Sequence, residues 1–201
     1  MSTKAFAVTY DYRCPFARNA HEHVVDAMHG GADWVVEFVP FSLTQSHIEE
    51  GGTPVWEVPE KVSDLTAIEA GLVVRDRYPE RFLDVHLALF TARHDDGRDL
   101  RDDAVVREVL KENGVDGDEV FAAIAEGWPR QAFRAAHESS VADHQVFGVP
   151  TFISGGASAF VRIMTRPGGD TTLARSTIEN ILDLLVGHPE INEFKHTSIS
   201  R

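Results

Sequence analysis

The segment AFAVTYDYRCPFARNAHEHVV, residues 5–25, contains the transition that decides the fold. Its first part alternates apolar residues and predicts a short buried strand over 5–10. Pro15 then favours a helix start, because the first turn of a helix needs no backbone N–H from that residue. An apolar stripe continues the helix until the glycine pair at 30–31 ends it. The single cysteine of the chain, Cys14, therefore lies where the strand gives way to the helix.

The rest of the sequence predicts one more strand, a helical middle and a terminal hairpin. Trp34–Phe41 is rich in valine and aromatic residues, as strands are, and a strand–helix–strand order predicts a parallel pair. From about 60 to about 145 the apolar period becomes about 3.6, which indicates helices. The stretch VFGVPTFISGGASAFVRIM, residues 146–164, predicts two strands joined by a Gly-Gly turn, and 171–186 predicts a closing amphipathic helix.

This order of elements predicts an α/β fold of the thioredoxin-like type, with an all-helical insertion between the second strand and the C-terminal hairpin. We expect residues 1–45 and 145–201 to form the thioredoxin-like domain and residues 46–144 to form the helical insertion. With 201 residues and 43% hydrophobic content, the chain is long enough to bury a core.

The composition argues against two classes of partner. The chain has 32 acidic residues against 19 Lys and Arg, and its net charge of −13 repels phosphate backbones and anionic lipid head groups. We therefore expect neither nucleic acid nor a membrane surface as a partner. The first residues lack the pattern of a secretory signal peptide, and a single cysteine suits a reducing compartment. A cytoplasmic location is the expectation that follows.

Cys14 is the main candidate for chemistry. A thiol reacts as its thiolate, and the unpaired N–H groups and dipole at a helix N-terminus favour that form. Arg13 adds positive charge beside it and Asp11 opposes this effect, so we expect a net shift toward the thiolate. The structural alternative is a small, buried, unreactive cysteine. The position at a helix start favours the functional interpretation.

A second motif, FGVPTF, begins the hairpin and contains Pro150. Only ~5–6% of X-Pro bonds in folded proteins are cis, so spacing alone leaves Pro150 an ordinary proline at the start of a strand. The two motifs are more specific together than apart, because they stand in a fixed order around a helical insertion.

In this order, the Cys-Pro helix start and the Gly-Val-Pro-Thr strand start resemble the DsbA-like family of thioredoxin-fold proteins. PFSLTQ after the second strand and FLDVHLALFTARHDDGRDL in the helical middle extend the resemblance over nearly the whole chain. Within the family, the sequence is most similar to the cytoplasmic FrnE-type branch, near 2-hydroxychromene-2-carboxylate isomerases and kappa-class glutathione transferases. The resemblance implies that Pro150 is cis and lies against Cys14. The backbone of Val149 would then face the thiol and could pair with a bound thiol peptide.

The sequence departs from the family pattern at Ala17, where a Cys-x-x-Cys protein carries its second thiol. Such a protein resolves its mixed disulfide internally, whereas Cys14 has no partner in the chain. Three outcomes remain open: a monothiol mechanism resolved by an external thiol, a transferase or isomerase in which Cys14 positions a small thiol, and a member without redox activity. The isomerase and kappa branch usually carries serine at this position, so the retained cysteine favours the monothiol mechanism.

The resemblance thus implies a thiol–disulfide oxidoreductase acting on a small thiol or disulfide, with Cys14 catalytic and glutathione or mycothiol as the external thiol. The substrate- or thiol-binding residues would be Arg13, Pro15, Phe16, Val149 and Pro150. We expect no tightly bound cofactor and no metal, and related proteins suggest a homodimer. The alternatives are a glutathione-transferase-like or isomerase-like enzyme and a non-catalytic thioredoxin-fold binding module.

Histidines supply the auxiliary candidates. His137 and His144 share a predicted helix face that leads into the second motif, so either could orient a substrate or act as a base for Cys14. That pairing leaves open a Cys–His hydrolase with Cys14 as nucleophile, although no orienting Asn or Asp is recognisable. His21 and His23 point in different directions on their helix, and we expect a solvated face there.

Several aromatic residues could line an apolar cleft between the insertion and the core. They are Phe16, Trp34, Phe41, Trp56 and Trp128. For Trp34 and Phe41 we expect plain core packing instead. The acidic run from Asp95 to Asp103 is expected to be a solvated loop and helix start rather than a cation site.

Overall fold

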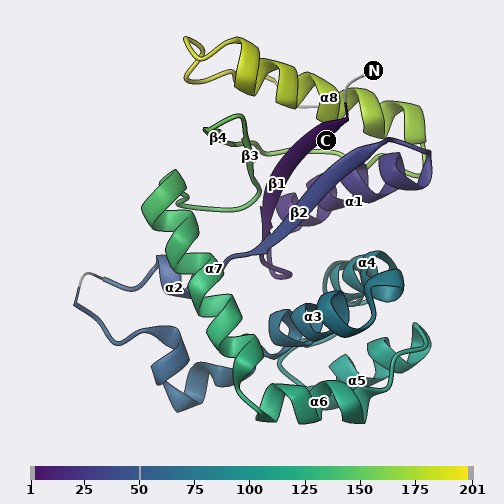
Figure 1. Cartoon of the computed structure of the whole chain (residues 1–201), viewed down its shortest axis with the longest axis vertical. Helices are drawn as coiled ribbons and strands as arrows, with labels where there is room; N and C mark the ends of the chain where they lie inside the picture. The colour runs from purple at the N-terminus through teal and green to yellow at the C-terminus, as the bar shows by residue number, and fades with distance from the viewer. Residues whose placement is uncertain (1–2, 50, 199–201) are drawn as a thin grey trace.

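The computed structural model describes residues 3–49 and 51–198 (Figure 1). Its centre is a four-stranded sheet with the order β2-β1-β3-β4. The strands are β1 (Lys4–Tyr10), β2 (Trp34–Pro40), β3 (Thr151–Ser154) and β4 (Ala157–Phe160). β1 pairs parallel with β2 and antiparallel with β3, and β3 pairs antiparallel with β4. The predicted parallel pair and the predicted terminal hairpin are confirmed.

The helices form two groups. α1 (Pro15–His29) and α8 (Thr171–Gly187) pack against each other beside the sheet. The elements between β2 and β3 are α2 (Leu43–Ser46), three 3-10 turns (Val55–Glu57, Pro59–Asp64, Pro79–Arg81), α3 (Thr66–Arg77), α4 (Phe82–His94), α5 (Asp103–Glu112), α6 (Gly117–Ala125) and α7 (Trp128–His144). Figure 1 shows α3 to α6 gathered at one end of the molecule, with α7 running from that group back toward β3. No helix in the described ranges is long and apolar enough to cross a bilayer.

Two local features set the hairpin and its place in the sheet. Gly155 and Gly156 have φ values of 58° and 80°, and a two-residue turn with positive φ at both positions matches the twist of the flanking strands. Glycine adopts this conformation without a steric penalty. On β1, the Thr9 hydroxyl accepts a hydrogen bond from the Thr151 N–H at 2.9 Å. This bond joins the start of β3 to the end of β1.

Helix α1 is buried on more than one side, so the expectation that His21 and His23 lie on a solvated face is wrong. Their side chains are only 0% and 2% exposed. The reason is that α8, α4 and β1 all contact the helix. His23 Nδ1 bonds to the Asn19 carbonyl at 2.9 Å inside the helix, whereas His21 enters a buried hydrogen-bond network.

This network connects α4 to β1. Tyr12 Oη lies 2.9 Å from His86 Nδ1, and His86 Nε2 lies 2.8 Å from His21 Nδ1. His21 Nε2 lies 3.2 Å from the Thr9 carbonyl. A carbonyl can only accept, so His21 donates from Nε2 and accepts at Nδ1. His86 must then donate from Nε2, and Tyr12 must donate its hydroxyl proton to His86. One carbonyl therefore determines both histidine tautomers.

We predict that Gly71→Ala in α3 lowers the free energy of unfolding by about 1–3 kcal/mol, because overpacking a filled core has that effect. An added Cβ would lie 2.6 Å from Tyr12 Oη, and the bond to His86 restrains that hydroxyl. Urea unfolding measures the change. In a Tyr12→Phe background the loss should be smaller, because the clashing oxygen is gone. Gly187→Ala is the matched control, since nothing lies within 4 Å of its Cβ position.

We also predict that stability falls between pH 7 and pH 5. Burial lowers the pKa of His21 to about 4, whereas an unfolded histidine titrates near 6.5. Between these values the unfolded state binds more protons, so His21 alone removes about 2 kcal/mol as the pH drops from 7 to 5. Urea unfolding at both pH values tests this, and His21→Gln should flatten the dependence. Equal stability at both pH values would contradict the prediction.

Candidate functional site

Cys14 is the N-cap residue of α1. Its Sγ accepts a hydrogen bond from the Ala17 N–H at 3.4 Å and donates one to the Val149 carbonyl at 3.4 Å. Its own N–H donates to the Asp11 carbonyl at 2.9 Å. The side chain is only 7% exposed. The thiol is therefore almost enclosed between the start of α1 and the loop before β3.

The loop before β3 brings the second motif to the thiol. The Val149–Pro150 peptide bond is cis, and Val149 is buried. Thr151 is held from two directions, because its N–H donates to Thr9 Oγ1 and its hydroxyl donates to the Gly148 carbonyl at 2.8 Å. These bonds keep the segment in place while the Val149 carbonyl faces the Cys14 thiol.

Burial raises the pKa of the Cys14 thiol. The N–H groups of Ala17 and Phe16 lower it and the charge of Asp11 raises it further, but burial is the largest effect. The expectation of a net shift toward the thiolate is therefore wrong. That expectation rested on the helix N-terminus, which is present, and did not include the desolvation of an enclosed thiol.

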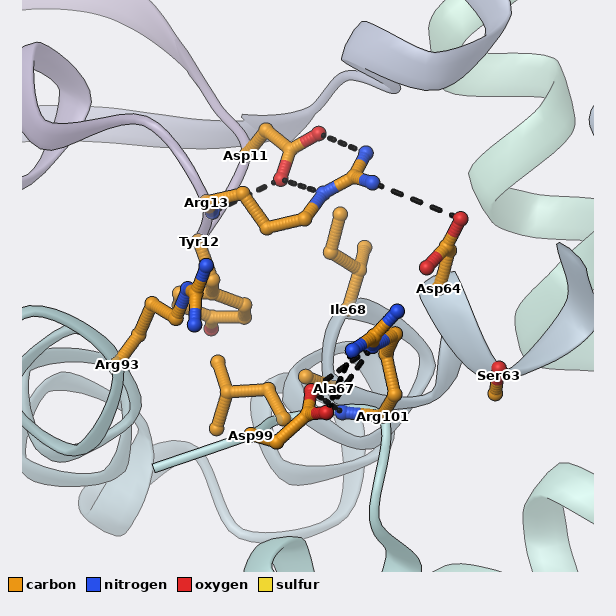
Figure 2. A pocket seen from close by; sticks show the side chains of 11 residues that line it. Asp11, Tyr12, Arg13, Ser63, Asp64, Ala67, Ile68, Arg93, Asp99 and Arg101 are labelled. Atoms are coloured by element: carbon orange, nitrogen blue, oxygen red, sulfur yellow. Dashed lines mark hydrogen bonds and ion pairs between the residues drawn. The ribbon is translucent and has the colours of Figure 1, made fainter. Parts of the chain in front are cut away.

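Arg13 does not supply free positive charge to Cys14. Its Nη2 and Nε donate to the Asp11 carboxylate at 2.9 and 3.1 Å, and its Nη1 lies 3.7 Å from Asp64 Oδ2. Burial acts to lower the pKa of Arg13, but the hydrogen bonds and charge of Asp11 outweigh it and raise the pKa. Figure 2 shows this guanidinium between the two carboxylates. Arg13 is thus part of an ion-pair cluster that shapes the loop.

A pocket of about 330 Å³ opens beside this cluster (Figure 2). Its wall combines the loop residues 11–13, the start of α3, the end of α4 and the loop between α4 and α5. Cys14 does not line the pocket, but Arg13, its neighbour in the chain, does. The loop therefore carries the thiol and also forms part of a cavity of ligand-binding size.

The other residues predicted around Cys14 lie at the start of α1. Pro15 is exposed and Phe16 is half-buried. The Arg162 guanidinium lies 5.5 Å from the Phe16 ring centroid, which is a cation–π distance. Trp34 and Phe41 are buried in the core, as expected. The Phe16 ring therefore lies at the start of α1 and contacts Arg162.

His137 lies in a second pocket of about 280 Å³, together with Trp56. Its ring packs on Phe41, with 4.3 Å between the ring centroids. Its Nδ1 accepts the Ser42 N–H at 3.2 Å, and burial lowers the pKa of His137 to about 4. The acceptor nitrogen is therefore already occupied, which does not suit a base for Cys14.

His144 is the last residue of α7, and its carbonyl accepts a hydrogen bond from the Ser158 hydroxyl at 2.9 Å. Within residues 3–49 and 51–198, the hydrogen bonds of the Cys14 thiol involve Ala17 and Val149, and neither histidine takes part. The arrangement therefore gives no support to a Cys–His hydrolase. In the same ranges, no group of three or more His, Cys, Asp or Glu could hold a metal ion.

Sequence reasoning missed two features of this region. The first is the network of Tyr12, His86 and His21, although His86 does lie on the apolar face of its predicted helix, and that signal could have indicated burial. The second is the approach of Arg93 and Arg101 to the pocket beside Arg13. No local pattern brings the end of α4 to the Cys14 loop.

Comparisons with known proteins place this geometry among thioredoxin-fold proteins. A family model for the DSBA-like thioredoxin domain matches residues 7–170. The solved structures with a similar fold include a 2-hydroxychromene-2-carboxylate isomerase, with a TM-score of 0.63 and 12% identity over 90% of this chain and 96% of that one. The cytosolic disulfide reductase DsbM from Pseudomonas aeruginosa has a TM-score of 0.61 and 15% identity, over 90% and 99%. DsbA from Pseudomonas aeruginosa has a TM-score of 0.59 and 20% identity, over 90% of this chain and 86% of that one. No curated protein sequence gives a significant match.

We predict that Cys14 reacts with iodoacetamide as a thiol of raised pKa, with a half-maximal rate above about pH 8.5, the value of an exposed cysteine. The reason is the burial of the thiol. The rate is measured by mass spectrometry from pH 6 to 10 against glutathione as an exposed reference thiol. Cys14→Ser must abolish labelling, since the chain has no other cysteine. A midpoint below that of glutathione would show that the helix N-terminus outweighs burial.

Proposed function

The chain belongs to the family of DSBA-like thioredoxin domains, and on this premise we propose that it is a thiol–disulfide oxidoreductase working through the single thiol of Cys14. Its resolving partner is an external low-molecular-weight thiol, and its setting is the reducing cytoplasm. The observation that carries the proposal is the position of Cys14 Sγ at the N-cap of α1, 3.4 Å from the carbonyl of Val149.

The monothiol mechanism follows from the residue at position 17. Ala17 is fully buried and contributes only its N–H to the thiol. A second cysteine at this position would attack the mixed disulfide from within the protein. Since Cys14 is the single cysteine of the chain, a mixed disulfide formed on it persists until a thiol arrives from solution.

The exchange has two balanced steps. Cys14 loses its proton to solvent, and its thiolate attacks one sulfur of a disulfide R–S–S–R, forming Cys14–S–S–R and releasing the thiolate RS⁻, which takes up a proton. A second thiol, R′–SH, then loses its proton and attacks the sulfur of the R group. This step forms R–S–S–R′ and returns Cys14 as a thiolate, which is reprotonated. No further oxidant or reductant is needed.

The enclosed position of Cys14 affects the two steps differently. The hydrogen bond from the thiol to the Val149 carbonyl must break before Sγ can attack, while the bond from the Ala17 N–H supports the thiolate. A thiol of raised pKa is also a poor leaving group. Release of Cys14 in the second step is therefore slow, and the mixed disulfide on Cys14 is long-lived.

Val149 and Pro150 form the docking side of the site in this proposal. When the thiol no longer bonds to the Val149 carbonyl, that carbonyl becomes free to accept a hydrogen bond from the backbone of a bound peptide-like thiol. Phe147, two residues earlier, is 72% exposed and packs on Phe160 with 5.3 Å between ring centroids. It offers an apolar surface next to the same loop.

A second candidate is a transferase or isomerase in which Cys14 only orients a bound thiol. The favouring observation is that the Cys14 thiol donates a hydrogen bond to the Val149 carbonyl, and burial raises the pKa of this thiol. A protonated thiol could equally donate to the thiolate of a bound molecule, and serine could replace it in that role. Retained thiol binding and turnover in Cys14→Ser would support this candidate, whereas a Cys14 that forms no adduct and no binding at all would indicate a non-catalytic module.

We predict that glutathione disulfide converts the protein to an adduct with one glutathione on Cys14, which intact-protein mass spectrometry detects. Cys14→Ser should give no adduct. Added reduced glutathione should release the protein slowly, over a longer time than it needs to reduce a small-molecule mixed disulfide, because Cys14 is a poor leaving group. A protein that stays unmodified at pH 8 over hours would overturn the proposal.

We further predict that Ala17→Cys changes the mechanism from monothiol to dithiol. The new sulfur would stand three residues from Cys14 at the start of α1, as in a Cys-x-x-Cys site. Glutathione disulfide should then yield an internal disulfide and no stable adduct. Ala20→Cys is the matched control, because Ala20 is as buried as Ala17 but lies almost two helical turns from Cys14. An adduct equally stable in Ala17→Cys and the unmodified sequence would contradict this prediction.

A further inference from the structure

The pocket beside the Cys14 loop is lined by charged side chains of both signs. Three arginines, Arg13, Arg93 and Arg101, and three aspartates, Asp11, Asp64 and Asp99, contribute to it. Figure 2 shows the three guanidinium groups on different sides of the same opening. They come from the loop after β1, from the end of α4 and from the loop between α4 and α5.

Two of the three arginines are already neutralised. Arg13 binds the Asp11 carboxylate and lies near Asp64. Arg101 binds Asp99 through both guanidinium nitrogens Nε and Nη2, at 2.9 and 2.7 Å. Arg93 forms no ion pair and no side-chain hydrogen bond within the described ranges, since its neighbouring aspartates bond to the other two arginines. Arg93 is therefore the cation of this pocket that remains available to a ligand.

The aspartates that line the pocket also include one carboxylate that is not fully hydrogen-bonded. Asp64 Oδ2 is 3.7 Å from Arg13 Nη1, beyond hydrogen-bond distance. Its side chain keeps 21% of its surface exposed. With Asp11 fully engaged by Arg13, Asp64 has room to accept from a ligand cation. Ser63 contributes a hydroxyl on the same side.

We propose that this pocket binds the α-amino carboxylate end of a small thiol, with Arg93 holding the carboxylate and Asp64 accepting the ammonium group. The proposal rests on the proposed function for the identity of the ligand as a thiol. It selects the glutathione class of external thiol over mycothiol, which carries neither a carboxylate nor an ammonium group.

The size and position of the pocket agree with such a ligand. Its volume of about 330 Å³ is at the lower end of the ~300–1,000 Å³ typical of ligand sites. Ala67, Ile68 and Leu100 provide an apolar part of the wall for the methylene groups of the ligand. Arg13, on the same wall, directly precedes Cys14, so the bound end lies on the loop that carries the reacting sulfur.

Binding to Cys14→Ser tests the pocket without any redox step. The probe is S-methylglutathione, which keeps the amino-acid end and cannot form a disulfide, and isothermal calorimetry measures its affinity. We expect saturable 1:1 binding. Arg93→Gln should weaken it roughly tenfold or more, as expected for loss of a charge-assisted hydrogen bond, and Arg93→Lys should weaken it less. Arg175→Gln on α8 is the matched control and should bind like the parent.

Two analogues separate the charges of the ligand. N-acetyl-S-methylglutathione lacks the ammonium group, and 4-aminobutyryl-S-methylcysteinylglycine keeps that group but lacks the α-carboxylate beside it, and both should bind at least tenfold more weakly. Absence of binding, equal binding of all three compounds, or binding unaffected by Arg93→Gln in a folded protein would overturn the pocket assignment. These outcomes leave the adduct on Cys14 untouched, so failure of the pocket and failure of the monothiol function are distinguishable.

Discussion

The site depends on the hydrogen bonds and ion pair that the buried carboxylate of Asp11 forms. It is 1% exposed, and a carboxylate so enclosed must be paired. It accepts hydrogen bonds from the N–H and guanidinium of Arg13 and from the Leu43 N–H at 3.0 Å. These bonds tie the loop after β1 to the chain leaving β2. Because the Asp11 carbonyl also accepts the Cys14 N–H, the residue that orders the loop also positions the thiol, and its charge raises the pKa of that thiol.

A second set of hydrogen bonds, formed by Thr9, fixes the site at the end of β1. Thr9 takes part twice: its carbonyl accepts from His21, and its hydroxyl accepts from the Thr151 N–H. The first bond leads through His86 to Tyr12, and so connects β1 to both α1 and α4. The second reaches the residue after Pro150. Burial keeps both histidines neutral by lowering the pKa of each, and neutral imidazoles are what this chain of donors and acceptors requires.

The parts of the structure that were predictable are those set by neighbours in the sequence. The alternation before Cys14, the proline after it and the glycine pair at 155–156 each act on a few adjacent residues, and the strand, helix start and turn follow from them. The contact between Cys14 and Val149 was predictable only from the resemblance to the DsbA-like family, because the spacing of the two motifs in the sequence does not show that they lie together. The burial of His21 depends on α4 and α8, which no local pattern places beside α1. Arg13 is neutralised mainly by its near neighbour Asp11, and only the second carboxylate, Asp64, comes from a distant segment.

The two departures from a dithiol site reinforce each other. In a Cys-x-x-Cys protein the second cysteine attacks the sulfur of the first, and the bound substrate leaves as its own thiolate, so the mixed disulfide is short-lived. Here Ala17 removes the internal attacker, and burial makes Cys14 a poor leaving group. Both changes lengthen the life of a mixed disulfide. The proposed monothiol mechanism therefore favours an external thiol that is bound near the site, because holding a reactant in place replaces a slow bimolecular encounter with a local one. The charged pocket on the Cys14 loop is the place where we propose that such a thiol binds.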